Sequence, residues 1–172
     1  QLAIVFLKCG LSATDIQSVL DDFAKLSGYG ELSVAPLMFV GHSAGGYLSL
    51  MTGCGVRPRP RAIVSFYGYG DIVGDWYSKP DPFYCRQPAI SKGEAYQAIG
   101  RTPISAAHGA RAESPIYYYC RQKGLWPNVV GGRDPALEPE FFAPYCPLRN
   151  VDPQTPPTLL LHGNQDTDVP YQ

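Results

Sequence analysis

The stretch "MFVGHSAGGYLSL", residues 38–50, decides how this chain folds. Its first half is a run of apolar, strand-forming residues that ends at Gly41, which predicts a buried strand. Its second half, directly after Ser43, reads as a helix that Gly53 and Gly55 bring to an end. A strand and a helix joined by so short a turn are typical of α/β proteins.

Three more apolar segments predict strands, at residues 2–7, 61–67 and 158–162. After the first of these, the spacing of apolar residues predicts a helix that begins near Thr14 and ends before Gly28. Because each strand candidate is apolar throughout, we expect both of its faces to be covered. We therefore predict the α/β class, with a mostly parallel sheet flanked by helices on both faces.

Residues 71–150 differ from the rest of the chain, because their aromatic residues, prolines and charges follow no clear period. We expect two or three short helices among them, and the best candidates are residues 92–99 and 114–122. A connection of about 80 residues is too long for a simple crossover between strands. We therefore predict a sheet core of residues 1–70 and 151–172, with 71–150 forming a cap-like insertion over one sheet edge.

The turn itself, Gly41-His42-Ser43-Ala44-Gly45, fits the pattern G-x-S-x-G. Chance supplies this pattern roughly once in ten sequences of this composition, so its context decides. A strand before it and a helix after it are what a nucleophile elbow requires. Such a turn strains the serine backbone and holds the hydroxyl clear of the sheet, and the glycines relieve crowding. The helix dipole and the Ala44 N–H would stabilise a tetrahedral oxyanion.

A nucleotide-binding loop is the alternative for this turn, and the residue types do not favour it. "GHSAGG" lacks the G-x-G-x-x-G spacing, an acidic residue about 20 positions later, and the lysine of a P-loop. The net charge of −1 gives no reason to expect nucleic-acid binding. No apolar run reaches the roughly 18 residues of a membrane span. The five cysteines include no C-x-x-C pair, and we expect no metal and no organic cofactor.

"GHSAGGYL" resembles the elbow of the α/β-hydrolase family, in its esterase and prolyl-oligopeptidase-like branches. A second segment, "LLLHGNQDTDVPYQ", is similar to the family's H-G-x-x-D-x-x-V-P segment, in the loop after a late strand. This resemblance implies that Asp166 is the acid of a catalytic triad, which holds a histidine in the correct tautomer. Asp168 is the competitor, and we interpret it as a solvated loop carboxylate. Asp71, after the strand that follows the elbow, is a third and weaker candidate.

The resemblance also implies a catalytic histidine beyond Gln172 and an H-G-G-G-type oxyanion loop ahead of the first residue. We therefore expect a fragment that is incomplete at both ends and is at most a weak catalyst by itself. The side chain of His42 should project away from that of Ser43. His162 should bond the backbone of the acid loop, and His108 should be a solvated loop residue.

These features together predict a serine hydrolase that cleaves small carboxylic esters through a Ser-His-Asp triad. A prolyl-oligopeptidase-like peptidase with a peptide substrate is the alternative, although alanine rather than tyrosine at position 44 favours the esterase. A non-catalytic binding protein with the same fold is a further alternative. The insertion carries aromatic residues, which we expect to form its own core in preference to a substrate pocket. They are Trp76, Tyr77, Phe83, Tyr84, Tyr117, Tyr118, Tyr119 and Trp126.

Overall fold

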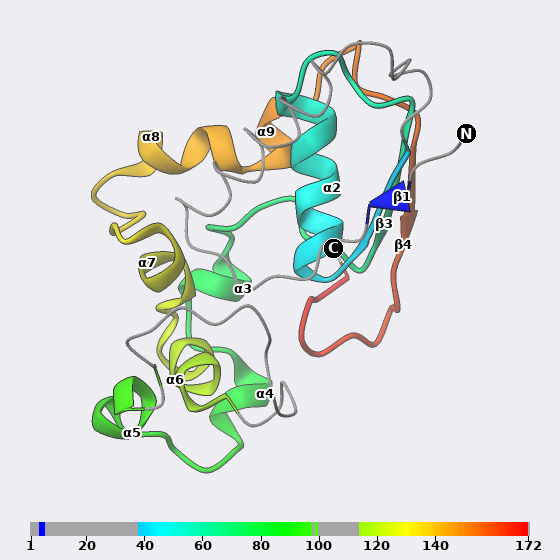
Figure 1. Cartoon of the computed structure of the whole chain (residues 1–172). Helices are drawn as coiled ribbons and strands as arrows, with labels where there is room; N and C mark the ends of the chain where they lie inside the picture. The colour runs from blue at the N-terminus through cyan, green and yellow to red at the C-terminus, as the bar shows by residue number, and fades with distance from the viewer. Residues whose placement is uncertain (1–3, 6–37, 98, 100–113, 172) are drawn as a thin grey trace.

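The computed structural model describes residues 4–5, 38–97, 99 and 114–171 of the chain (Figure 1). Its strands form one sheet in the order β1-β2-β3-β4, and every neighbouring pair is parallel. The strands are β1 (Ile4–Val5), β2 (Met38–His42), β3 (Ala62–Phe66) and β4 (Thr158–Leu161). The predicted parallel sheet is therefore confirmed. The expected helix between Thr14 and Gly28 lies outside the described residues.

Helix α2 (Ala44–Gly55) follows β2 after a single residue and packs on β2 and β3. The two strands bury alternate positions, of which Phe39 and Ile63 are examples, against this helix. The intervening positions on the other face are partly or fully exposed, because the described helices all lie on the α2 side of the sheet (Figure 1). Within the described residues, helices therefore cover one face of the sheet, and the helix predicted between Thr14 and Gly28 is not among these residues.

Strand β4 departs from the sequence prediction, because all four of its residues are exposed. Leu159 is 53% exposed and Leu160 is 65% exposed, although the apolar run predicts a strand covered on both faces. The reason is its position in the sheet. β4 is an edge strand of the described sheet, and α2 packs on β2 and β3.

The region between β3 and β4 contains more helices than the sequence predicts. These helices lie on the side of α2 that faces away from the sheet (Figure 1). The two expected helices are confirmed, and most of the others are single turns, too short to show a period. Several begin at a proline, which suits the first turn of a helix. The helices are α3 (Asp75–Ser78), α4 (Pro82–Cys85), α5 (Lys92–Gln97), α6 (Pro115–Lys123), α7 (Trp126–Gly131), α8 (Pro139–Phe142), the 3-10 helix η2 (Ala143–Tyr145) and α9 (Pro147–Asn150).

The aromatic residues of this region form a packed interior, as predicted. Tyr77 and Tyr117 are buried, and each lies edge-on or tilted against the ring of Trp126. Farther along the chain, Phe142 is buried in one apolar cluster with Tyr47 of α2. The region is therefore attached to the sheet through α2. No helix among the described residues has the length and apolar character of a membrane-spanning segment.

Candidate active site

Ser43 connects β2 to α2 in a strained backbone conformation, with φ 55° and ψ −124°. Its N–H donates to the carbonyl oxygen of Phe66 at 2.9 Å, and its carbonyl accepts from the N–H of Tyr47 at 3.0 Å. A serine that merely begins a helix has extended backbone angles and caps the helix with its hydroxyl. Ser43 has neither feature within the described chain. A non-glycine residue held at positive φ points to a functional turn.

The exposure of Ser43 differs from the sequence expectation of a hydroxyl that stands clear of the sheet. Only 6% of the residue surface is accessible. The tight turn places the residue between the end of β3, through Phe66, and the first turn of α2, through Tyr47. Ser43 is therefore buried between β3 and α2, at the end of the sheet where the strands have their carboxyl ends.

The glycines around the serine are required by close backbone approaches. A Cβ at position 41 would lie 2.0 Å from the carbonyl oxygen of Gly45, so the pattern's two glycines meet each other. A Cβ on Gly46 would lie 2.9 Å from the Cα of Gly68, the second residue after β3. The sequence analysis missed Gly68. Its position just after an apolar strand is the only feature of the sequence that could have indicated this close approach. These contacts press α2 against the end of β3.

Ala44 is the first residue of α2, so its N–H is one of the amides that lack an acceptor inside the helix. The 12-residue helix contributes a positive potential at this end, and no acidic residue occupies its first turn. An oxyanion formed at Ser43 would lie beside this N-terminus. The position of Ala44 therefore suits the oxyanion-binding role that the sequence suggests.

Asp166 lies in the loop after β4, where two backbone amides hold its carboxylate. Its Oδ1 accepts from the N–H groups of Asp168 and Val169, both at 2.9 Å. Its Oδ2 lies 3.8 Å from Nε2 of His162. That ring nitrogen is 2.7 Å from the carbonyl oxygen of Val169, so it carries the proton and donates. His162 thus bonds the backbone of the acid loop, as predicted.

Ser43 and the Asp166 loop lie at the same end of the sheet, because the carboxyl ends of the parallel strands β2, β3 and β4 all lie there. The N–H of Ser43 bonds the carbonyl of Phe66 in β3, and Phe66 pairs with Leu161 in β4. Figure 1 shows the start of α2 and the loop after β4 at one end of the sheet. One strand therefore separates the serine from the acid loop.

Asp168 is bonded to side chains of α4 and α6, so the prediction of a solvated carboxylate is wrong. Its Oδ1 accepts from the hydroxyl of Tyr84 at 2.6 Å, and it also accepts from the hydroxyl of Tyr117. Nη1 of Arg121 lies 3.2 Å from Oδ1 and donates to the carbonyl oxygen of Asp168 at 2.7 Å. The cause is the buried guanidinium of Arg121 in α6, and no local pattern in the acid loop predicts this contact.

Arg121 is fully buried, and a second carboxylate shares its charge. Its Nη2 donates to Oδ2 of Asp81 at 2.7 Å, while Oδ1 of Asp81 caps α4. Rings surround the guanidinium carbon, the nearest being that of Tyr84 at 4.6 Å. Burial, and next the bond to Asp168, raise the pKa of Tyr84, and burial raises the pKa of Tyr117. Both phenols therefore keep their protons and donate.

The remaining predicted residues make contacts with other parts of the chain or lie outside the described residues. His42 is exposed, and its ring lies 6.0 Å from that of Tyr67. Asp71 accepts from the N–H of Val73 at 2.8 Å and has the thiol of Cys146 at 3.3 Å, so it serves a local turn. His108 lies outside the described residues. Tyr67, which the sequence analysis missed, sits at the site edge with φ 39°.

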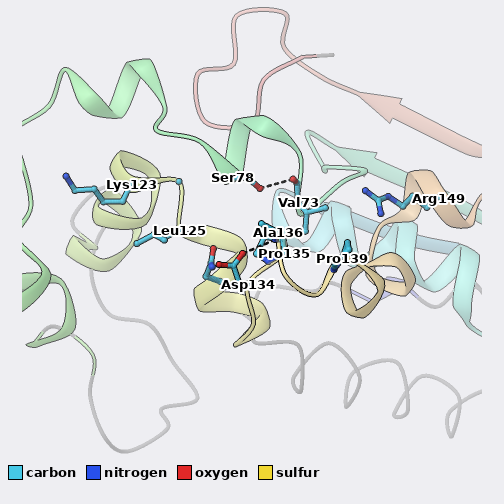
Figure 2. A pocket seen from close by; sticks show the side chains of 11 residues that line it. Val73, Ser78, Lys123, Leu125, Asp134, Pro135, Ala136, Pro139 and Arg149 are labelled. Atoms are coloured by element: carbon cyan, nitrogen blue, oxygen red, sulfur yellow. Dashed lines mark hydrogen bonds between the residues drawn. The ribbon is translucent and has the colours of Figure 1, made fainter.

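A cavity of about 490 Å³ opens among the helices between β3 and β4, and none of the predicted site residues lines it (Figure 2). Ser78 of α3 lines it, and the Ser78 hydroxyl donates to the carbonyl of Val73 at 2.7 Å. The lining residues are Val73, Ser78, Lys123, Gly124, Leu125, Asn128, Asp134, Pro135, Ala136, Pro139 and Arg149. This cavity is separate from the Ser43 turn.

Known proteins resemble the chain over part of their length. No family model matches it. Over 162 residues it is 26% identical to the non-reducing polyketide synthase Preu6 of Preussia isomera, covering 78% of this chain and 7% of that protein. Among solved structures, a Staphylococcus aureus protein of unknown function is 25% identical with a TM-score of 0.66. That match covers 91% of this chain and 53% of the other, so the chain spans about half of that protein.

Weaker structural likenesses extend to hydrolases. An acylaminoacyl peptidase from Pyrococcus horikoshii matches with 18% identity and a TM-score of 0.48, over 92% of this chain and 19% of that one. A truncated carbohydrate esterase from gut microbiota matches with 18% identity and a TM-score of 0.46, over 91% and 50%. The Staphylococcus aureus match, with its TM-score of 0.66, shows that the fold of this chain recurs in a known structure.

Proposed function

We propose that the protein is a serine hydrolase that cleaves carboxylic esters with Ser43 as its nucleophile. The observation that carries this proposal is the backbone of Ser43, held at φ 55° and ψ −124° between a parallel strand and a 12-residue helix. Such strain persists only where the surrounding structure enforces it. Here the approach of Gly41 to Gly45 enforces it.

In this proposal, a histidine other than His42 and His162 takes the hydroxyl proton as Ser43 Oγ attacks the ester carbonyl carbon. The carbonyl oxygen gains a negative charge, which the Ala44 N–H and the N-terminus of α2 stabilise. Collapse of this intermediate expels the alcohol, which takes the proton from the histidine, and leaves an acyl-enzyme. Water then releases the acid by the same steps. Asp166 orients the histidine and balances its charge.

The test is labelling of the full-length protein, histidine included, by a fluorophosphonate probe, which reacts with an activated serine and not with an ordinary one. We expect labelling of the unaltered protein and none of the Ser43→Ala variant. Ser78→Ala is the matched control, because it removes a serine hydroxyl that donates to the Val73 carbonyl and lines a cavity that contains none of the predicted site residues. Labelling that survives in Ser43→Ala refutes the proposal. Hydrolysis of a peptide substrate in preference to an activated ester would move the activity to the peptidase class.

A further inference from the structure

We propose that Arg121 is a positioning residue, which holds the Asp166 carboxylate in place through Asp168. The inference rests on the proposed function, because it gives Asp166 the role of the triad acid. It assigns the inserted region a part in catalysis beyond covering the sheet. It also explains why Asp168 is anchored when its place in the sequence suggests a solvated residue.

The first step concerns the orientation of the Asp166 carboxylate. Two backbone amides, those of Asp168 and Val169, donate to the same oxygen, Oδ1. This pair of bonds restrains the orientation of the carboxylate through Oδ1, while Oδ2 lies 3.8 Å from Nε2 of His162. In the proposed function, Oδ2 is the oxygen that faces the catalytic histidine. Any movement of the backbone at residues 168 and 169 therefore turns the acid.

The second step concerns what holds that backbone. Arg121 Nη1 donates to the main-chain carbonyl of Asp168 at 2.7 Å and also lies 3.2 Å from its carboxylate. The hydroxyls of Tyr84 and Tyr117 donate to the same carboxylate oxygen. Main chain and side chain of residue 168 are thus both held from α4 and α6.

The third step concerns the rigidity of the anchor. The Arg121 side chain has no exposed surface, and its other terminal nitrogen is occupied by Asp81 at 2.7 Å. One planar guanidinium therefore bridges two carboxylates, a geometry that a lysine ammonium does not reproduce. Asp81 in turn caps α4 through the N–H groups of Phe83 and Tyr84. The acid loop is connected in this way to the interior of the inserted region.

The decisive variant is Asp168→Asn in the full-length protein, which removes the anchoring charge at nearly unchanged volume. The Asp168 side chain is 34% exposed, and Arg121 keeps Asp81, so the fold should persist. We expect hydrogen–deuterium exchange in residues 166–169 to rise by about tenfold or more, while that of β2 and β3 stays unchanged. We expect kcat to fall by about 100-fold with KM changed less than twofold, because a displaced catalytic group slows the chemical step.

Arg121→Lys tests the fork geometry at constant charge, and we expect the same rise in exchange and the same loss in kcat. Arg133→Lys is the matched control. Arg133 is also ion-paired, to Glu138, and lies 4.7 Å from the Phe141 ring, but its side chain is 48% exposed. We expect this control to leave exchange in the acid loop and kcat unchanged. If Arg121→Lys unfolds, Asp168→Asn decides the question.

The exchange measurement separates this inference from the proposed function. Unchanged exchange at residues 166–169 in Asp168→Asn overturns the positioning role, even where Ser43 is labelled normally. Absent labelling of Ser43 in the unaltered protein overturns the proposed function, while the exchange data still report whether the anchor holds the loop. A rise in exchange with kcat unchanged overturns the link between the anchor and catalysis.

Discussion

The Cβ that any other amino acid would carry at position 41 lies 2.0 Å from the carbonyl oxygen of Gly45. The end of β2 and the first turn of α2 therefore approach each other more closely than any side chain permits. This contact keeps Ser43 at positive φ, because a looser turn would let the serine relax to an ordinary conformation. The backbone conformation of the proposed nucleophile therefore depends on this close approach.

Gly41→Ala should destabilise the protein by about 3 kcal/mol, the upper end for overpacking, because the atom that must move is backbone. The same variant should lose fluorophosphonate labelling at Ser43. Urea unfolding measures the change in free energy. Gly55→Ala is the control, because nothing lies within 4 Å of its added carbon at the end of α2, and we expect a change within about 0.5 kcal/mol. Equal losses in the two variants would contradict the role of the close approach.

The elbow is predictable from the sequence because its constraints are local. An apolar run, two glycines and a serine within thirteen residues specify the strand, the turn and α2. The parallel order of β2, β3 and β4 follows, because apolar strands in an α/β chain align their carboxyl ends. The sequence therefore also predicts that the acid loop after β4 lies at the same end of the sheet as Ser43.

The environment of Asp168 is not predictable in the same way, because its partners are distant in sequence. Tyr84 is 84 residues away, and Arg121 is 47. Burial of a cation among aromatic rings leaves no periodic sign, and a proline-initiated single turn such as α4 leaves none either. The exposure of β4 also depends on which helices cover it, a property of the assembled sheet.

Tyr67→Gly should destabilise the protein by about 1 kcal/mol less than Phe66→Gly does, because Tyr67 holds a positive φ that glycine adopts without strain. The two residues are 39% and 37% exposed, so the two variants should lose similar amounts of packing. Phe66→Gly is the matched control, because Phe66 is in a regular strand position. Chemical denaturation of both variants measures the difference. Similar destabilisation by both would show that Tyr67 is not strained.

Asp152→Asn should flatten the acid dependence of stability. Hydrogen bonds from Arg59, at 2.6 and 2.5 Å, lower the pKa of Asp152 to about 2. An unfolded chain has this pKa near about 3.9, so the ion pair stabilises the fold above that pH. Its contribution disappears as the pH falls from about 4 towards 2.

Melting temperatures measured between pH 2 and pH 5 provide the test of this ion pair. The unaltered protein should lose more stability across that interval than Asp152→Asn does. Asp75→Asn serves as the control, because Asp75 is paired with Lys79 on the surface, where its side chain is 79% exposed. Its pH dependence should match that of the unaltered protein. Parallel curves for Asp152→Asn and the unaltered protein would exclude a role for the ion pair.

The described cysteines should react with iodoacetamide in an order set by burial. Burial raises the pKa of Cys120 to about 11, and burial likewise raises the pKa of Cys146 to about 11. The thiolate is the reactive form, so at pH 8 both side chains should stay unmodified in the folded protein. Cys85 is exposed and should be modified at least about tenfold faster. Peptide mass spectrometry during a time course measures these rates, and urea should abolish the difference. Modification of Cys120 as fast as Cys85 in the folded protein would mean that α6 opens in solution, and with it the anchor of the acid loop.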